Sequence, residues 1–178
     1  MNFKSIWRVL TMSEFKTVFG SLENYEKGHI EIIDDDPKAY AFSNIFEVAN
    51  QSAPYEKVVV GKNLKYVIET LRAEGDSDWY TCAHDEFVVC MDGEIEVHLV
   101  KLNNSASYTP ENKEGSVKLE SDPEGPKMGR IILRHGHQAL LPKGSAYRFS
   151  NRKKPGVLIM QTICGDHSVE KWAEICYS

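Results

Sequence analysis

Apolar and polar residues alternate regularly over residues 83–99, on both sides of the dipeptide Asp92-Gly93. An Asp-Gly pair supplies the positive φ angles of a two-residue type I′ turn, so this stretch predicts a β-hairpin. The turn sets three residues of the first strand opposite three of the second: Cys90 opposite Ile95, Val88 opposite Val97 and Glu86 opposite Leu99. Side chains alternate along a strand, so these residues and His84 share one face, which is apolar apart from His84 and Glu86.

The rest of the chain repeats short runs of β-branched and apolar residues that are separated by Gly and Pro. These runs predict strands over residues 29–33, 55–60, 64–75, 129–136, 137–144, 147–151 and 156–164, with a turn at residues 61–63. A helix is the competing interpretation of residues 64–74. Short strands between Gly and Pro turns are typical of an all-β sandwich or barrel.

A few segments do not follow this strand pattern. Residues 1–28 are expected to be an N-terminal arm with a short helix near residues 13–19, and residues 40–51 fit a strand or an irregular segment. Ser168 as a cap, followed by apolar residues at helical spacing, predicts a C-terminal helix over residues 168–176. Residues 29–178 then form one domain, interrupted by a polar insertion at residues 103–127. That insertion is either mobile, which its composition favours, or ordered by a partner.

Composition and charge narrow the function classes. The chain has 178 residues, of which 42% are hydrophobic and 26% charged, and its formal net charge is −5. Such fractions are typical of a globular domain with a sizeable core. A nucleic-acid-binding protein normally carries a basic patch, whereas the longest basic run here is Arg152–Lys154. Nucleic acid is therefore not expected as a partner.

The cysteines and the apolar runs indicate a cytoplasmic location. The four cysteines show no C-x-x-C spacing, which favours reduced thiols. Lys4 and Arg8 interrupt the first apolar residues, so no signal peptide is expected, and no apolar run has membrane-spanning length. We expect a cytoplasmic protein without membrane contact.

Glu86 carries the first indication of chemistry, because an ionised carboxylate on an apolar face is costly unless it is paired or binds a metal. One interpretation places Glu86 at the mouth of the sheet, paired with an arginine or lysine. The other places it, with His84, in a site inside a barrel.

Five residues between Gly136 and Asn151 follow a fixed spacing: Gly136, Pro142, Gly144, Tyr147 and Asn151. In this spacing the segment resembles the second motif of the cupin family, which has a histidine where this chain has Tyr147. The resemblance implies a double-stranded β-helix, that is, a jelly-roll barrel.

The first cupin motif is matched only in part. Glu86 and Gly93 agree with its glutamate and its last glycine. The two histidine positions hold other residues in either possible register: Tyr80 and Cys82, or Trp79 and Thr81. Of the family's four metal-ligand positions, only Glu86 carries the expected residue.

This pattern predicts no metal in the chain, because a catalytic first-row metal needs about three imidazole or carboxylate ligands. The fallback metal site combines His84 and Glu86 with His135 or His137. His98 is excluded, because the hairpin register turns it away from Glu86.

Four further blocks, residues 32–44, 55–64, 72–79 and 170–176, resemble the small subunit of two-component hydroquinone 1,2-dioxygenases. That resemblance implies Fe(II)- and O₂-dependent cleavage of hydroquinones to hydroxymuconic semialdehydes, with the iron in a larger cupin subunit. This chain would then support the catalytic subunit in a heterotetramer and would not be catalytic alone.

Trp79, Tyr80, Glu86 and Tyr147 are the candidate substrate-pocket or interface residues. Trp79 has an aromatic face that suits a planar phenol in the partner; the alternative, which base rates favour, is that it caps this chain's own core. Tyr80 and Tyr147 are placed to hydrogen-bond each other or Glu86. Two alternatives remain open: an independent metal-dependent cupin enzyme using His84 and Glu86, and a metal-free cupin that binds a small molecule, with Tyr147 or Glu86 as acid or base.

Overall fold

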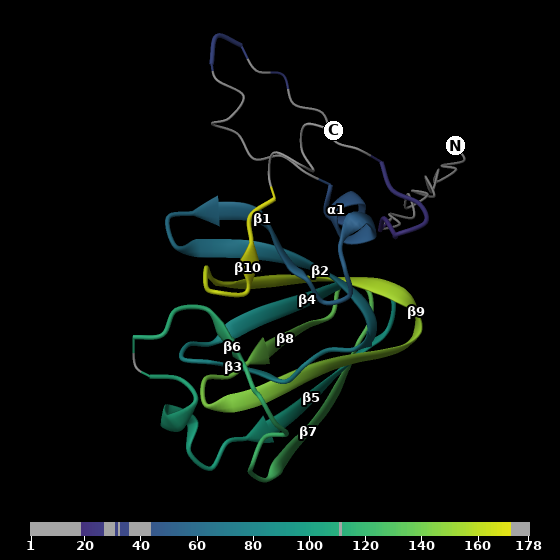
Figure 1. Ribbon diagram of the computed structural model, residues 1–178. Coiled ribbons are helices and arrows are strands. Elements are labelled where there is room, and N and C mark those ends of the chain that lie inside the picture. Colours follow the sequence, from purple (N-terminus) through teal and green to yellow (C-terminus); the bar gives the residue numbers. More distant parts are fainter. Residues whose placement is uncertain (1–18, 27–30, 32, 36–43, 111, 172–178) are drawn as a thin grey trace, which may run out of the picture.

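The computed structural model describes residues 19–26, 31, 33–35, 44–110 and 112–171 (Figure 1). Within these residues the elements follow one another in this order: α1 (Ile45–Gln51), β1 (Lys57–Asn63), β2 (Tyr66–Asp76), β3 (Tyr80–Cys82), β4 (Glu86–Asp92), β5 (Ile95–Lys101), the 3₁₀ helix η2 (Ser105–Ser107), β6 (Ser116–Lys118), β7 (Lys127–Leu133), β8 (Gln138–Leu141), β9 (Ser145–Ile163) and β10 (Ser168–Val169). No described helix is long and apolar enough to cross a membrane.

The long strand β9 joins two sheet layers. Its second half pairs with β2 and β4, which gives the order β10-β1-β2-β9-β4-β8 in the first layer. Its first half pairs with β3 and β5, which gives β6-β3-β9-β5-β7 in the second layer. Figure 1 shows β9 curling from one layer into the other. The result is the predicted all-β jelly-roll barrel.

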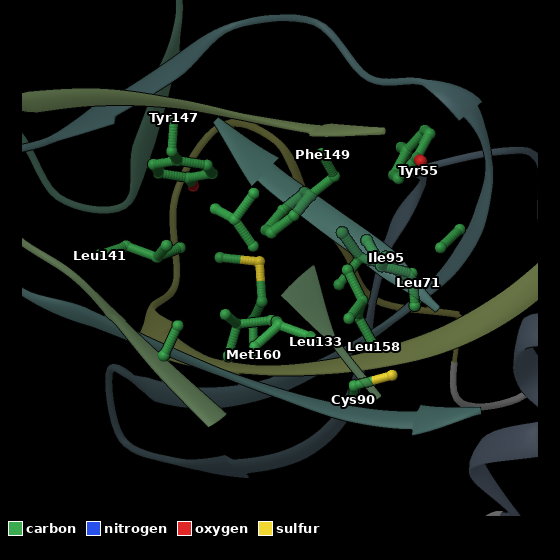
Figure 2. Close-up of a cluster of buried hydrophobic side chains, with 14 of the residues drawn as sticks. Tyr55, Leu71, Cys90, Ile95, Leu133, Leu141, Tyr147, Phe149, Leu158 and Met160 are labelled. Atoms are coloured by element: carbon green, nitrogen blue, oxygen red, sulfur yellow. The ribbon is translucent and has the colours of Figure 1, made fainter. Parts of the chain in front are cut away.

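The core fills the space between the layers. Figure 2 shows Tyr147 at one end of this cluster and Tyr55 at the other, with Phe149 between them. The face predicted to be apolar around Asp92-Gly93 is buried, because Val88, Cys90, Ile95 and Val97 are all 0% exposed. The alternation in the sequence therefore identified the inward side chains of β4 and β5 correctly.

The predicted hairpin itself is wrong. β4 pairs with β8 and β9, and β5 pairs with β7 and β9, so the two strands do not pair with each other. Gly93, with φ 86°, carries the chain from one layer to the other. In a barrel this crossing lets both apolar faces meet across the core, whereas a flat hairpin would leave them on one side of a single sheet.

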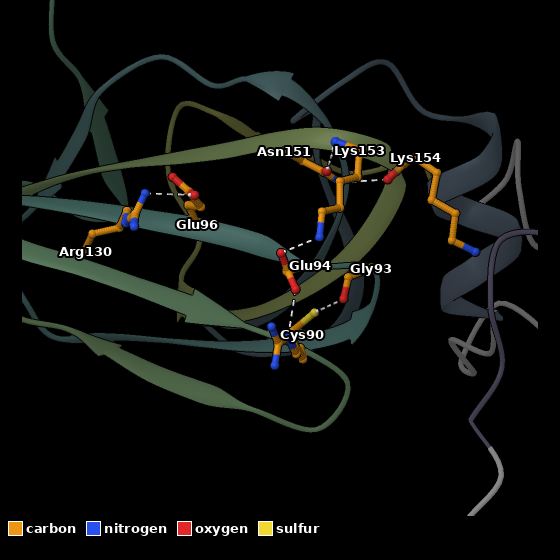
Figure 3. A network of polar contacts seen from close by, with 9 residues as sticks. Cys90, Gly93, Glu94, Glu96, Arg130, Asn151, Lys153 and Lys154 are labelled. Carbon is orange, nitrogen blue, oxygen red and sulfur yellow. Dashed lines mark hydrogen bonds and ion pairs between the residues drawn. The ribbon is translucent and has the colours of Figure 1, made fainter.

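Polar contacts hold this end of the barrel. Glu94 accepts hydrogen bonds from Lys153 at 2.7 Å and from Arg134 at 2.8 Å. Asn151, the last residue of the second motif, donates to the carbonyl of Lys154 and accepts from the backbone N–H of Lys153 (Figure 3). These contacts fix the bend of β9 beside the Gly93 crossing.

The first long hairpin has its turn later than predicted. β1 continues through residues 61–63, and the chain turns at Leu64 and Lys65, where Leu64 has φ 57°. Between Val59 and Gly61 the pairing register shifts, because β1 has one residue more than β2 at this point. The alternative of a helix over residues 64–74 is wrong, since β2 occupies this segment.

Residues 40–51 contain a helix that the sequence interpretation missed. The Asn44 side chain accepts from the backbone N–H of Phe46 at 2.9 Å and caps α1, which then buries Phe46 and Ala49 against Val157. The cap was a recognisable signal, but seven residues are too few for a clear helical period.

Two other segments also differ from expectation. The polar insertion at residues 103–127 contains η2 and β6, which pairs with β3, and it buries Leu119. Ser168 and Val169 form β10 beside β1 where the predicted C-terminal helix was to begin. Residues 172–178 and the helix predicted near residues 13–19 lie outside the described residues, apart from Phe19, and so does most of the strand predicted at residues 29–33.

Candidate functional site

A cluster of polar side chains lies inside the barrel, at the end of the core where Tyr147 lies. Lys57 comes from β1, Glu69 from β2, Tyr80 from β3, Glu86 from β4 and Tyr147 from β9. All five residues are buried. We call these five residues the interior polar cluster.

Lys57 is the positively charged member of the cluster and is only 2% exposed. Its Nζ donates to Ser116 Oγ at 2.5 Å and to the Tyr147 hydroxyl at 3.2 Å. The same ammonium lies 4.3 Å from the centre of the Tyr80 ring, a cation–π contact. Lys57 thus contacts two of the positions that hold metal-binding histidines in the cupin motifs. Its sequence signal is weak, because a lysine that begins an apolar strand usually lies at the surface.

Glu86 is completely buried, as the apolar pattern around it predicted. Its Oε1 accepts from Thr162 Oγ1 at 2.6 Å, while Oε2 has no hydrogen-bond partner among the described residues. The surface interpretation of Glu86, paired with an arginine or lysine at the mouth of the sheet, does not fit this position. Glu86 lies in the interior.

Glu69 is a second buried carboxyl group that the sequence interpretation missed. Its Oε1 accepts from Ser168 Oγ at 2.5 Å, and its Oε2 has no partner among the described residues. Burial raises the pKa of Glu69. The charge of Lys57 and the hydrogen bond from Ser168 lower this pKa by less than burial raises it, and the nearby Glu86 raises it further. The folded protein therefore keeps a proton on this carboxyl group to a higher pH than the unfolded chain does.

Tyr147 and Tyr80 stack, with ring centres 6.1 Å apart. Burial and the Glu86 carboxylate raise the pKa of Tyr147 well above its usual value, and burial also raises the pKa of Tyr80. Both side chains are therefore neutral phenols near neutral pH, and neutral phenols are poor metal ligands.

Cys82, at the end of β3, and His84, on the connection from β3 to β4, lie next to the cluster. Cys82 Sγ is 3.1 Å from His84 Nδ1 and donates to the Gly115 carbonyl at 3.2 Å. His84 Nε2 is 3.1 Å from Thr162 Oγ1, which also donates to Glu86. One ligand atom from each of Cys82, His84 and Glu86 lies within 4.8 Å of the others, so these three are the group most able to hold a metal.

This arrangement does not fit the catalytic iron that cupin dioxygenases use. Burial raises the pKa of the Cys82 thiol to about 12, so without a metal this side chain is a neutral thiol. The cupin ligand positions offer two neutral phenols, one protonated thiol and one carboxylate, with an ammonium among them. An open iron site needs about three imidazole or carboxylate ligands.

The other fallback histidines lie elsewhere. His135 Nε2 is 2.9 Å from Asp92 Oδ1, and His137 Nδ1 accepts from the backbone of Arg134. Both lie at the Cys90 end of β4, about 13 Å along the strand from Glu86 at the usual rise per residue. The structure therefore does not bring His135 or His137 to Glu86. His98 faces outward, as the sequence interpretation required, and contacts Glu96 at 3.1 Å.

Trp79 lies outside the barrel interior, half-buried on the outer face of the second layer. Its Nε1 donates to Asp122 Oδ1 at 3.0 Å, and the ring packs against the small cluster of Leu102, Leu119 and Ala146. The Arg148 guanidinium lies 4.8 Å from the ring centre. Trp79 therefore covers a small second cluster of this chain's own core and is itself only half-buried.

Comparison with solved structures identifies near relatives. A chain of the hydroquinone 1,2-dioxygenase from Sphingomonas sp. TTNP3, with 4-hydroxybenzoate bound, is 58% identical, with 91% of this chain and 97% of that chain covered and a TM-score of 0.86. A chain of the hydroquinone 1,2-dioxygenase PnpCD, in complex with Cd²⁺ and 4-hydroxybenzonitrile, is 55% identical, with 93% and 98% covered and a TM-score of 0.84. No protein-family model and no curated protein sequence matches the chain.

A longer chain shares the fold alone. It comes from PnpCD in complex with Fe³⁺, is 10% identical, and has a TM-score of 0.57 over 85% of this chain but only 40% of its own length. With these relatives the fold is the all-β cupin barrel that the two sequence motifs predicted. The PnpCD structures thus contain a chain of about this length and a longer chain with a similar barrel.

Proposed function

Since this chain belongs to the hydroquinone 1,2-dioxygenase family, we propose that it is the small subunit of a two-component dioxygenase and carries no catalytic metal itself. The observation that carries the proposal is Lys57, whose ammonium group lies among the cupin ligand positions. The positive charge of Lys57 there repels a metal cation, and it partly offsets the negative charge of the buried carboxylates.

The larger subunit would hold the iron. Fe(II), when bound there, supplies the O₂-dependent chemistry that cleaves a hydroquinone ring to a hydroxymuconic semialdehyde. The PnpCD structures, which contain a longer chain of the same fold besides a chain of about this length, support the existence of a larger partner subunit. We propose a heterotetramer of the two kinds of subunit, in the cytoplasm, where the free thiols of Cys82, Cys90 and Cys164 would stay reduced.

This chain's own residues would shape and shield the partner's substrate pocket. Trp79 presents an indole face that suits a planar phenol, and the barrel behind it positions that ring. Tyr80, Glu86 and Tyr147 lie inside the barrel and would act by stabilising it, with Tyr147 linked to Lys57. Residues 29–178 would form the barrel domain, with residues 1–28 as an arm.

The test compares metal content and activity of the chain alone and of the coexpressed complex. We expect the isolated chain to hold well below one metal ion per molecule, and the complex to hold iron and consume O₂ with hydroquinone. A stable complex with a larger cupin chain is required. Absence of any such complex after coexpression with the neighbouring genes would reject the proposal.

A second candidate function rests on Cys82, His84 and Glu86, whose ligand atoms lie within 4.8 Å of one another. In this case the chain would be an independent metal-dependent cupin. Near-stoichiometric metal in the pure single chain, lost in Glu86→Gln but retained in the distant variant His137→Gln, would decide for it.

A further inference from the structure

A row of side chains crosses the outer face of the second layer, on the opposite side of the sheet from the interior polar cluster. Arg148 on β9 is directly opposite His98 on β5, and His98 is directly opposite Arg130 on β7. Trp79 continues the row, because Tyr80 pairs with Tyr147 and the Arg148 guanidinium lies 4.8 Å from the Trp79 ring centre. We call Trp79, Arg148, His98 and Arg130 the basic row.

The basic row lines a groove of about 310 Å³, whose wall also includes Lys127. Like charges directly opposite each other in a sheet repel, so a row of this kind needs acidic partners. Glu96 is such a partner for part of the row: it contacts Arg130 and His98, each at 3.1 Å (Figure 3 shows the Arg130 contact). Asp122 accepts from the Trp79 indole.

Arg148 is left without a carboxylate. Its Nε atom is buried and has no hydrogen-bond partner, and no ion pair joins its guanidinium to an acidic side chain in the part of the chain that the structure describes. A guanidinium stacked on an indole is held flat and oriented, so its edge is ready for a two-pronged hydrogen bond with a carboxylate. A guanidinium that no carboxylate of the described residues neutralises favours an acidic group from outside the chain.

The surroundings of the groove indicate a protein as the source of that carboxylate. Met128 and Ile132, on the outward face of β7 beside Arg130, are 49% and 43% exposed. Tryptophan, arginine and methionine exposed together are typical of the central part of protein interfaces. The groove lies on the outer face of a sheet, which a second barrel can cover.

We propose that the basic row is a contact surface for the larger dioxygenase subunit, which places an aspartate or glutamate carboxylate on Arg148. This inference rests on the proposed function, because it names the surface through which that partner binds. The acidic residue of the larger subunit pairs with the Arg148 guanidinium, and its neighbouring side chains cover the exposed residues of β7.

The experiment measures the dissociation constant of this chain and the coexpressed larger subunit for the wild type, Arg148→Met and Arg148→Lys. The matched control is Arg152→Met, which lies on the same strand, is exposed and pairs with Asp76. We expect Arg148→Met to weaken binding about tenfold or more, Arg148→Lys to weaken it less, and the control to bind like the wild type. The salt dependence of binding should be smaller for Arg148→Met than for the wild type.

Unfolding of the free variants, followed by circular dichroism, separates lost contact from lost fold, and Arg148→Lys provides a folded comparison. If Arg148→Met binds the larger subunit as tightly as Arg152→Met, the basic row is not the contact surface, although the proposed function stands. If benzoate binds the free wild-type chain at Arg148 and the complex is insensitive to Arg148→Met, the groove is a small-molecule site and the inference is wrong. If the wild type forms no complex at all, the proposed function itself fails.

Discussion

Lys57 determines the chemistry of the barrel interior. Three positions that would hold metal-binding histidines in a cupin have become Tyr80, Cys82 and Tyr147, and a lysine from β1 reaches two of them. The ammonium partly balances two buried carboxyl groups, a task that a metal ion performs in metal-dependent barrels. A barrel can therefore lose its histidines and still retain a buried glutamate.

Replacement of Lys57 by methionine removes that cation while keeping most of the side-chain volume. The variant loses the two hydrogen bonds of the ammonium group, and the buried carboxyl groups of Glu69 and Glu86 lose the nearby positive charge. The free energy of unfolding should therefore fall by about 3 kcal/mol. Urea unfolding of the purified chain measures this change. Lys62→Met, on the same strand but exposed and paired with Glu170, should change the free energy of unfolding far less. Equal losses in the two variants would contradict a special role for Lys57.

Glu69 gives the chain a predictable pH dependence. Its pKa in the folded state lies above its ordinary value of 4.5, so over a range of pH the folded protein keeps a proton that the unfolded chain has released. The corresponding stability is present below the unfolded pKa and is lost as pH rises through the folded pKa. Wild-type stability should therefore fall as pH rises above about 4.5, the unfolded value, relative to Glu69→Gln, which keeps the acceptor for Ser168. If the free energy of unfolding depends on pH in the same way in both proteins, the raised pKa is not that of Glu69.

At the scale of the elements, the crossing between β4 and β5 and the bend of β9 lie in direct contact and depend on each other. Gly156 on β9 lies against the carbonyl of Asp92 at the end of β4, and a Cβ at this glycine would be 2.4 Å from that oxygen. The close approach of two backbones lets β9 change layers where β4 ends. Asn151 holds the same bend by bonds to the backbone of Ala73 and Lys154.

Gly156→Ala should therefore destabilise the protein by about 1–3 kcal/mol, because backbone has to move to admit one methyl group. Thermal and urea unfolding provide the measurement. Gly61→Ala in β1 is the matched control, since its Cβ would meet Ile68 at an ordinary 3.7 Å and should change stability by less than about 0.5 kcal/mol. If Gly156→Ala leaves the stability unchanged, the backbone at the crossing can move to admit a methyl group at no cost.

At the scale of the whole molecule, the two faces of the second layer have different roles. The inner face closes a barrel whose polar cluster is satisfied largely by this chain's own residues. The outer face presents Trp79 and Arg148, which forms no ion pair with any acidic residue that the structure describes, although the chain as a whole has a net charge of −5. A basic groove on an acidic protein favours a specific acidic partner over general attraction to polyanions.

Trp79 links this surface to catalysis in the proposed complex. Trp79→Leu should lower kcat/KM for hydroquinone about tenfold, as expected for the loss of roughly 1.4 kcal/mol of aromatic contact, while the iron content of the complex stays unchanged. Trp79→Phe keeps an aromatic ring and should retain most of the activity. Oxygen-uptake kinetics and metal analysis of the same samples give both readouts. If iron is lost along with activity, Trp79 supports assembly and does not line the pocket.

The sequence by itself determined the fold class and the inward faces of β4 and β5, including that Glu86 shares the apolar face. These follow from local rules: alternation sets which side chains point inward, and the spacing from Gly136 to Asn151 identified the barrel. The sequence also identified the family through residue blocks that need no three-dimensional information.

Only the tertiary structure decided which strands pair and what surrounds Glu86. Asp92-Gly93 fits a hairpin turn and a crossing between layers equally well, and the choice depends on β8 and β9, which lie far along the chain. Lys57 and Glu86 are 29 positions apart in the sequence, and no local pattern brings a β1 lysine among residues of β3 and β9. Arg148 and Trp79 are likewise neighbours only because β3 pairs with β9, since contacts between distant segments are set by packing of the whole chain.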